Sequence, residues 1–549
     1  MTRAQEKMVL FVLFLGALIV RVWGIGFGLI HADEPIVVNH AMAYGLGDLN
    51  PHFFKIPPLV SYLLFGCYAF WFFVGKMLGF FNGTESFVKL FLGQPERFYI
   101  MARIIFGASL GILTVFVVFK DVKRFFSKSQ AVWAAVFLAF NFLHVRDSHY
   151  IYVDIPMTLA VWVTTTWCLC LLEKRRLHYY FMAGAGVGIS CAIKYNAALS
   201  AAPIVVAHFL SDSKRLFFLF FASAVAIFTF YLCNPFASLD AGSFWLELKG
   251  QAGAEGAVGM AHHLFYSLWH GLGPGVFVLG FIGIFSLFRS EPKKAAVLFS
   301  FPCIFLLSLF FFSQTHERYV LPLIPFVCAA AGIAADRLLD EAKVRWVRTL
   351  VLGCIFISLM HPMAKIVQSN HLFVERDTAL VLKDWMGQNL PAGSKIAFDH
   401  SFYRPDINRS PEQWNQMASR DIEDSRVAKK IKWMKEIGKG QPGYSIYFLS
   451  DSTDGHHFSS VWPILPFDPM RMKNEGIEYV VVHYEADPKN EAFMEWLRKN
   501  GKRVARISPY MDETQNRPFD RFAVTCAPLM AKELFSRNRL GPVFEVYKL

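Results

Sequence analysis

Long apolar runs separated by short polar segments fill the chain up to about residue 362. Most of them approach the roughly 20 residues that a helix needs to cross the hydrocarbon core of a bilayer. The pattern therefore predicts a polytopic α-helical membrane domain over residues 1–362. The runs are residues 8–30, 57–80, 97–119, 131–145, 156–172, 179–193, 196–210, 216–233, 271–288, 295–312, 319–335 and 346–362.

The run at residues 57–80 differs from the others because it opens with Pro57 and Pro58 and carries Lys76 and Gly79 near its end. If it crosses the membrane, five of the six segments rich in Lys and Arg come out on the external side. If it does not, all six share the side of the N-terminus, as cytoplasmic loops do. We therefore interpret this run as an interfacial or re-entrant helix. About eleven spans follow, with a cytoplasmic N-terminus and an external C-terminal region.

Residues 363–549 mix polar and apolar positions at ordinary charge density, and they predict a small soluble α/β domain. Helices are expected at residues 376–391, ended by Pro391, and at residues 491–501, ended by Gly501. Short runs of β-branched and aromatic residues predict strands. These strands are expected at residues 395–399, 444–450, 477–484, 502–508 and 544–549.

Composition supports a membrane protein, since 54% of the 549 residues are hydrophobic and only 18% are charged. The net charge of +12 is what Lys and Arg in cytoplasmic loops produce. No basic stretch interleaved with aromatic residues suggests a nucleic-acid partner. Eight of the nine cysteines lie in or at apolar runs, so a disulfide framework is not expected.

The predicted topology gathers the polar segments with ionisable side chains on the external face. A structural protein has no reason for this asymmetry, so the external face is the candidate site. The segments are residues 31–55, 146–154, 194–196, 235–270 and 314–319. The glycine-rich part of 235–270 lacks the Gly-Lys-Ser/Thr ending of a phosphate-binding loop, and it suits a loop that orders over a substrate.

Three carboxylates stand out in these segments. Asp33 and Glu34 directly follow the first apolar run, and Asp154 ends the segment 146–154. Carboxylates beside a bilayer are costly, so they tend to bind cations, pair with bases or move protons. Two of them from separate loops, such as Asp33 and Asp154, suit a hard divalent cation. Alternatively, these residues only cap the helices that follow them.

Three basic residues lie in the same external segments. Arg146, Lys194 and Arg318 suit a phosphate group, because guanidinium and ammonium groups make charge-assisted hydrogen bonds to its oxygens. In the alternative interpretation they anchor helix ends at the membrane interface, where long basic side chains reach towards water.

The motifs HADEP, GDLNPHFFKIPPL, RDSHYIYVDIP, IKYNA and RYVLPLIP occur in this order along the membrane half. Together they resemble glycosyltransferase family 39, the dolichyl-phosphate-mannose protein mannosyltransferase-like group of the GT-C fold. The short KIPPL match also resembles lipid A aminoarabinose transferases. The resemblance implies an integral protein, of the bacterial inner membrane, that moves a sugar with inversion from a polyprenyl-phosphate donor. The acceptor it implies is a lipid, glycan or protein at the extracytoplasmic face. The chain lacks the bulky luminal-loop insertion of eukaryotic protein mannosyltransferases, so a protein acceptor in particular is not implied.

The resemblance also implies roles for individual residues. The first-loop acid of the family corresponds to Asp33, or to Glu34, and the second-loop acid corresponds to Asp154. A divalent cation at Asp33 and Asp154 is compatible with the family and not required by it. Contacts to the donor phosphate are expected from Arg146, Lys194, Arg318 and Lys55, and contacts to the substrate from His149, Tyr195 and Tyr319.

Two other classes remain open from the sequence. A transporter or flippase for a lipid-linked or anionic solute also carries ionisable residues in its spans, but it predicts charges near the midplane and paired repeats. A non-catalytic scaffold leaves the external acids without a role. Transfer of a labelled sugar distinguishes these classes from an enzyme.

Overall fold

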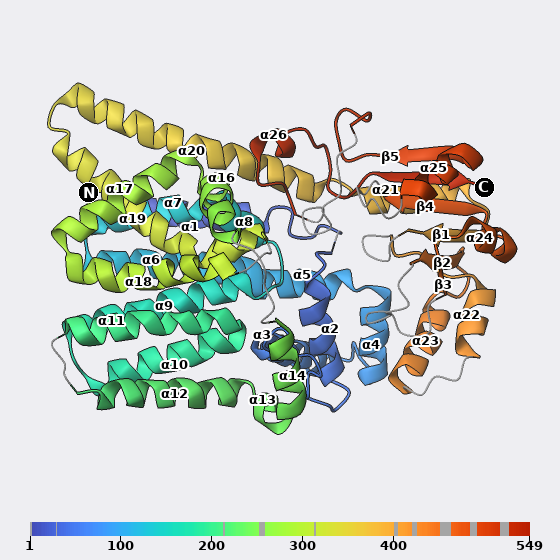
Figure 1. The fold of residues 1–549 in the computed structure, drawn as a ribbon, viewed down its shortest axis with the longest axis horizontal. Helices are drawn as coiled ribbons and strands as arrows, with labels where there is room; N and C mark the ends of the chain where they lie inside the picture. Colours follow the sequence, from blue (N-terminus) through green and yellow to red (C-terminus); the bar gives the residue numbers. More distant parts are fainter. Residues whose placement is uncertain are drawn as a thin grey trace.

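The computed structural model describes residues 3–28, 30–211, 215–251, 258–311, 315–399, 405–419, 425–450, 463–483, 491–515 and 526–549. Figure 1 shows an elongated molecule in which long helices fill one end and a β-sheet with its own helices fills the other. Short helices from the N-terminal quarter lie between the two ends. The chain is therefore mostly helical, as its hydrophobic pattern predicts.

Long helices form the end of the molecule opposite the sheet (Figure 1). Their apolar residues outnumber polar ones all round, as in helices that meet both a core and lipid. They are α1 (Arg3–Val22), α5 (Glu96–Ala102) with η1 (Arg103–Ser109) and α6 (Leu110–Phe125), α7 (Lys128–Ala139), α8 (Phe142–Asp147), α9 (Asp154–Glu173), α10 (Leu177–Ile193), η2 (Tyr195–Ala201) with α11 (Ala202–Leu210), α12 (Phe217–Cys233), α17 (Pro274–Ser290), α18 (Pro292–Ser308), η5 (Glu317–Leu323) with α19 (Ile324–Glu341), and α20 (Arg345–Val374).

Among the described residues, six helical segments are long and apolar enough to cross a membrane. A bent pair, Gly259–Leu272 with Pro274–Ser290, makes a seventh if it counts as one span, and its two halves meet at 112°. Other apolar helices, such as α10 and α12, are shorter. The protein is thus an integral multi-pass membrane protein, while the number of about eleven spans stays a prediction.

The expected interfacial run corresponds to α3 (Leu59–Met77), which lies between α2 (Glu34–Tyr44) and α4 (Thr84–Gly93) along the chain. By length and composition α3 is one of the six possible spans. Figure 1 shows it close to end-on, whereas α10 and α12 run across the view, so α3 lies crosswise to the long helices. This orientation supports an interfacial position, and the topology derived from it stays a prediction.

Helix α19 lies at the centre of the helical end. Within the segment Glu317–Glu341, which contains it, 89% of the apolar stretch is buried inside the protein. Glycines allow its neighbours to come close. A Cβ atom at Gly283 of α17 would collide with the backbone of Ala330, and one at Gly332 would collide with the backbone of Ala134 in α7. This packing fixes α19 and thereby the short helix η5 that leads into it.

The C-terminal sheet has the strand order β3-β2-β1-β4-β6-β5. Strands β3, β2, β1 and β4 are parallel, and β6 pairs antiparallel with both β4 and β5. The sequence pattern located all of them except the two-residue β3. The strands are β1 (Lys395–Phe398), β2 (Ser445–Leu449), β3 (Ile464–Leu465), β4 (Tyr479–His483), β5 (Lys502–Ile507) and β6 (Phe544–Lys548).

Helices cover this sheet, and two of them correspond to the expected ones. α21 (Thr378–Asn389) begins after Asp377, whose side chain accepts a hydrogen bond from the Leu380 backbone, and α25 (Glu491–Asn500) ends before Gly501. The others are α22 (Pro411–Ala418), α23 (Ser425–Ile437) and α24 (Pro469–Glu475), whereas α26 (Ala531–Leu534) lies beside α20 (Figure 1). The expected domain boundary at residue 363 lies inside the continuous helix α20, because the apolar run ends there but the helix does not.

Candidate active site

Four charged side chains meet where α2 and α9 begin and α10 ends. Asp33 occupies the N-cap position of α2, Asp154 is the first residue of α9, and Lys194 follows the last turn of α10. Arg318 lies in η5, immediately before the central helix α19. Residues from four separate parts of the sequence thus converge, as the loop placement in the sequence predicted.

Arg318 links the two carboxylates. Its Nη2 atom lies 2.7 Å from Asp33 Oδ2, and its Nε atom lies 3.6 Å from Asp154 Oδ2. Lys194 Nζ donates to the other oxygen of Asp154 at 2.7 Å. All four side chains are less than 20% exposed, so their charges act in a medium of low effective dielectric constant.

The capping interpretation of the two acids is not what their side chains do. Asp33, at the N-cap of α2, makes no side-chain cap hydrogen bond, and Asp154 is the first residue of α9, whose N-cap is Val153. Both carboxylates turn instead towards Arg318 and Lys194.

Aromatic rings flank the two cations. Arg318 lies 5.1 Å from the ring centre of Tyr152, and Lys194 Nζ lies 4.8 Å from the ring centre of Tyr319. Cations over ring faces gain electrostatic stabilisation. Tyr319, expected to contact substrate, therefore lies beside the charged cluster. Tyr195 is turned elsewhere, and its hydroxyl donates to the Phe54 carbonyl at 2.8 Å.

Glu34 has a different environment from Asp33. Its carboxylate is fully buried, and Arg103 donates to both oxygens at 2.7 Å. The backbone N–H groups of Ile151 and His31 donate to the same two oxygens, at 3.1 and 2.9 Å. Glu34 is thus a fully bonded buried anion that ties the start of α2 to η1 and to the segment before α9.

His31 lies directly behind Asp33. Its Nδ1 atom accepts a hydrogen bond from the backbone N–H of Asp33 at 3.1 Å. Burial, together with the positive charges of Arg318, Arg146 and Arg103, holds the pKa of His31 well below its ordinary value. The ring is therefore neutral near pH 7 and fixes the backbone that carries the Asp33 carboxylate.

Arg146, an expected phosphate contact, is buried and already paired. Its Nε atom lies 2.8 Å from Asp147 Oδ2, and its Nη1 atom contacts the Glu317 carboxylate. The same Nη1 donates to the carbonyl oxygen of Ala527 at 3.1 Å. Arg146 therefore links the helical end of the molecule to a C-terminal segment, and its donors point to protein groups.

Two further expected contacts lie outside the charged cluster. His149 is buried, its ring nitrogens lie 2.9 and 3.1 Å from the carbonyl oxygens of Val145 and Trp23, and its ring stacks on Phe373. This environment is that of a packed structural histidine. Lys55 is an exposed residue of the loop between α2 and α3.

A narrow cavity opens at the charged cluster. Cys526 brings the C-terminal region into its wall, which sequence reasoning missed because no motif or periodicity marks that segment. Among the described residues, no group of three or more His, Cys, Asp or Glu side chains is arranged to hold a metal ion. The lining residues are His31, Asp147, Tyr150, Tyr152, Asp154, Ile155, Arg318 and Cys526.

A second, larger cavity of about 500 Å³ is almost wholly apolar and lies between α11, α17, α18 and α19. Leu323, at its wall, belongs to the same short helix η5 as Arg318. Leu264 and Leu268 line it from η3 (His263–Leu268), and the ring of His263 in η3 lies 6.0 Å from that of Tyr319. The apolar cavity and the charged cluster are therefore connected through η5, which contributes a residue to each.

Known proteins share parts of this architecture. Residues 86–238 match the sequence model of the family described as dolichyl-phosphate-mannose-protein mannosyltransferase. No curated protein sequence matches the chain.

Solved structures match over nearly the whole chain. ArnT from Cupriavidus metallidurans in the apo state is similar with a TM-score of 0.55 at 14% identity, and ArnT bound to undecaprenyl phosphate with a TM-score of 0.57 at 13% identity. Each match covers 92% of this chain and 97% of ArnT. The Archaeoglobus fulgidus oligosaccharyltransferase in complex with Zn and sulfate has a TM-score of 0.46 at 12% identity, covering 89% of this chain and 69% of its own.

Proposed function

We propose that this membrane protein, whose GT-C glycosyltransferase fold the likeness to ArnT confirms, is an inverting transferase that uses a polyprenyl-phosphate sugar. The observation that carries the proposal is the cluster of Asp33, Asp154, Lys194 and Arg318, together with an apolar cavity that shares η5 with it. The acceptor is a hydroxyl group of a lipid, glycan or protein at the extracytoplasmic membrane face.

The apolar cavity and the charged cluster suit the two parts of such a donor. A polyprenyl chain fits the apolar cavity, and its phosphate then lies near η5, where Lys194 and Arg318 offer positive charge. Undecaprenyl phosphate, the ligand of one ArnT structure, has these two parts. Charge-assisted hydrogen bonds from guanidinium and ammonium groups to a phosphate are about twice as strong as neutral ones.

Arg318 couples phosphate binding to the release of Asp33. A phosphate group that binds Arg318 competes with the Asp33 carboxylate, which contacts the same guanidinium. Asp154 keeps its contacts to Lys194 and Arg318 and thereby positions both cations. Asp33 then becomes available for a proton, whereas Glu34 stays bonded to Arg103.

In the chemical step, Asp33 accepts the proton of the acceptor hydroxyl. The acceptor oxygen forms a bond to the anomeric carbon while the bond between that carbon and the phosphate oxygen breaks. The electron pair leaves with polyprenyl phosphate, and Lys194 and Arg318 stabilise its added negative charge. A single displacement of this kind inverts the sugar carbon, and the general base contributes about 10² to 10⁴ in rate.

Sugar transfer in proteoliposomes tests the proposal. The purified chain is mixed with polyprenyl phosphate that carries a radiolabelled hexose, and labelled product and free hexose are measured. We expect label to leave the donor by transfer or by hydrolysis, and the Asp33→Asn protein to be at least about 10²-fold slower. Movement of intact donor between leaflets without cleavage would instead identify a flippase.

The proposed orientation places the C-terminal sheet outside the cytoplasm. It rests on the distribution of Lys and Arg and on α3 not crossing the membrane. Protease added to intact spheroplasts should remove residues beyond α20, and full protection would reverse the orientation.

A further inference from the structure

Helix α20 keeps an exposed apolar stripe along most of its length. In the helical segment Arg345–Asn389, which begins with it, only 22% of the apolar stretch is buried inside the protein. Met360, Val367 and Val374, seven residues apart, share one face of the helix and are exposed. The exposed Arg348 marks one limit of the hydrocarbon core, because charged side chains avoid it. From Arg348 to Val374 the helix is about 39 Å long, longer than the core of about 30 Å even at an ordinary tilt. The far end of the stripe therefore reaches the headgroup layer.

The short helix α26 lies against this far end of α20. Gln368 of α20 donates from Nε2 to the Arg537 carbonyl at 3.1 Å. Just past α20, the Thr378 backbone N–H donates to the Leu540 carbonyl at 3.0 Å. Figure 1 shows α26 at the same level along the long axis as α3 and α14 (Ala241–Gln251), next to the ends of α10 and α12. The segment around α26 is thus held at the level where the long helices end.

Three large apolar side chains of this segment and its neighbour are exposed. Met530 and Phe535, on either side of α26, and Met511 are these residues, and they are called here the α26 patch. The Met511 backbone N–H donates to the Ser536 carbonyl at 2.9 Å, which keeps the patch together. Leu534 is fully buried. The segment therefore has a packed side towards the protein and an apolar side that faces outwards.

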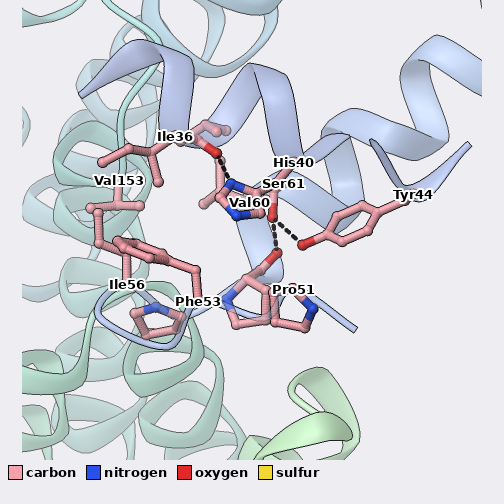
Figure 2. Close-up of a pocket in the computed structure, with 12 residues that line it drawn as sticks. Ile36, His40, Tyr44, Pro51, Phe53, Ile56, Val60, Ser61 and Val153 are labelled. Atoms are coloured by element: carbon pink, nitrogen blue, oxygen red, sulfur yellow. Dashed lines mark hydrogen bonds between the residues drawn. The ribbon is translucent and has the colours of Figure 1, made fainter. Parts of the chain in front are cut away.

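Helix α3 exposes apolar residues at the same level on another side of the molecule. Its inner face is tied to α2, because the Tyr44 hydroxyl lies 3.1 Å from Ser61 Oγ and Ser61 donates to the Pro58 carbonyl at 2.8 Å (Figure 2). Its outer face leaves Phe70 and Phe73 exposed. The α26 patch is therefore one of several apolar surfaces at this level.

The level shared by α3, α14 and α26 has the properties of a membrane interface. In α14, Trp245 and Leu246 are exposed as well. A surface in water rarely carries so many large apolar side chains, whereas the boundary between headgroups and acyl chains takes up Trp, Phe and Leu. The α26 patch also adjoins the stripe of α20, since Val367 directly precedes Gln368, which holds α26. It is thus continuous with a surface that faces lipid.

We infer that the α26 patch rests on the lipid bilayer, with its side chains at the boundary between headgroups and acyl chains. Lys532 and Asp512, beside the patch in sequence, are both exposed, so the surroundings carry charges of both signs. The apolar side chains, rather than net charge, therefore bind the membrane. The contact requires no particular lipid headgroup.

The patch follows directly on the segment that reaches the charged cluster. Cys526 lines the narrow cavity there, and the Ala527 carbonyl accepts a hydrogen bond from Arg146. Met530 comes three residues after Ala527. Contact with lipid at Met530 and Phe535 therefore holds this cavity wall, and the C-terminal sheet with it, against the membrane half of the protein.

Photocrosslinking in phosphatidylcholine vesicles tests the assignment. The probe p-benzoylphenylalanine takes the place of Phe535 in the full chain, and under ultraviolet light its ketone inserts into C–H bonds that touch it. Mass spectrometry of the modified peptide identifies the product, and we expect phospholipid adducts. The probe at Met530, a second position of the same patch, should give the same adducts. No step uses sugar transfer, so the outcome is independent of the proposed function.

Two exposed positions outside the patch serve as controls. Phe356 on α20 faces lipid and should form adducts. Met470 on α24 is 66% exposed but lies at the end of the molecule away from the long helices (Figure 1), so it should form none. Adducts at Phe356 and at neither patch position would overturn the inference. Crosslinks from the patch to a second copy of the chain, in place of lipid, would overturn it too and would identify a surface for self-association.

Discussion

Asp33 and Glu34 are neighbours in sequence, yet they lie in two different kinds of environment. Glu34 is fully buried and receives four hydrogen bonds, two of them from the buried Arg103. The Asp33 side chain is 14% exposed, and Arg318 is its charged partner at hydrogen-bonding distance. Consecutive residues at a helix start point about 100° apart, so one acid faces the packed interior and Arg103 while the other faces Arg318.

This difference separates a structural ion pair from a reactive one. A buried charge pair is stable only when its hydrogen bonds are nearly complete, because desolvation of each ion costs several kcal/mol. The pair of Glu34 and Arg103 satisfies that condition. The pair of Asp33 and Arg318 does not need a complete set of hydrogen bonds within the protein, because it borders a cavity and either partner can take a new ligand.

The largest effect on activity is expected from Asp33→Asn. The amide keeps the size and most hydrogen bonds of the carboxylate but accepts no proton, so transfer should fall by about 10² to 10⁴. The amount of folded protein should stay the same. Asp48→Asn, at a partly exposed carboxylate of the same loop, is the control and should leave transfer near its normal rate, as measured with labelled donor.

The closest contrast is Glu34→Gln. It leaves Arg103 buried without a compensating charge, and breaking such a pair costs about 3–5 kcal/mol. We expect less folded protein and a lower midpoint of thermal unfolding in detergent, with a smaller loss of activity per folded molecule. The double variant Glu34→Gln with Arg103→Met should recover stability because both charges are gone. If the Glu34→Gln protein were stable but inactive while the Asp33→Asn protein stayed active, Glu34 would be the base and Asp33 the structural acid.

The sequence pattern marked both acids as candidates, but it could not show that their environments differ. Both followed an apolar run at a predicted membrane surface, so both qualified as catalytic. The separation depends on Arg103, which is 69 residues away inside what reads as a uniform apolar helix. Pairings over that distance leave no local periodicity.

The same limit applies to the basic residues and to the fold. Strands β1, β2, β4, β5 and β6 could be located because each is a short run of β-branched and aromatic residues. Lys194 and Arg318 were found because they lie at the ends of apolar runs. Arg146 looked equivalent, but its carboxylate partners and the Ala527 carbonyl come from distant segments. Nor could composition reveal that α20 continues past residue 363.

A matched pair of arginine variants extends the comparison to the binding of the donor, where a smaller effect is expected. Arg318→Lys keeps the charge but removes the guanidinium fork, and we expect the KM for the donor to rise about ten-fold, since a hydrogen bond to a charged group contributes roughly 1.5–3 kcal/mol. Arg146→Lys makes the identical chemical change where the partners are Asp147 and Glu317. It should lower thermal stability and leave the donor KM unchanged; the reverse pattern would assign the phosphate to Arg146.

The smallest expected effect concerns His31, which lies between the two acids. Its pKa is held below the ordinary value of 6.5 by burial and by Arg318, Arg146 and Arg103, and the nearby Asp33 carboxylate, 3.7 Å from Nδ1, does not reverse this. Above about pH 7 the ring is neutral in both the folded and the unfolded chain, so stability does not change with pH through this group. Below pH 6.5 only the unfolded chain takes up the proton, so stability falls by about 1.4 kcal/mol per pH unit.

Thermal unfolding between pH 7.5 and about pH 5.5 measures this dependence on His31. His31→Asn offers a side-chain oxygen near the position of Nδ1, so it can accept the Asp33 backbone hydrogen bond, but it does not titrate in this range. The wild-type midpoint should fall more steeply on acidification than that of the variant, whose remaining slope reports the other histidines. Parallel slopes for the two proteins would mean that His31 titrates equally in both states, and the neutral ring behind Asp33 would then be excluded.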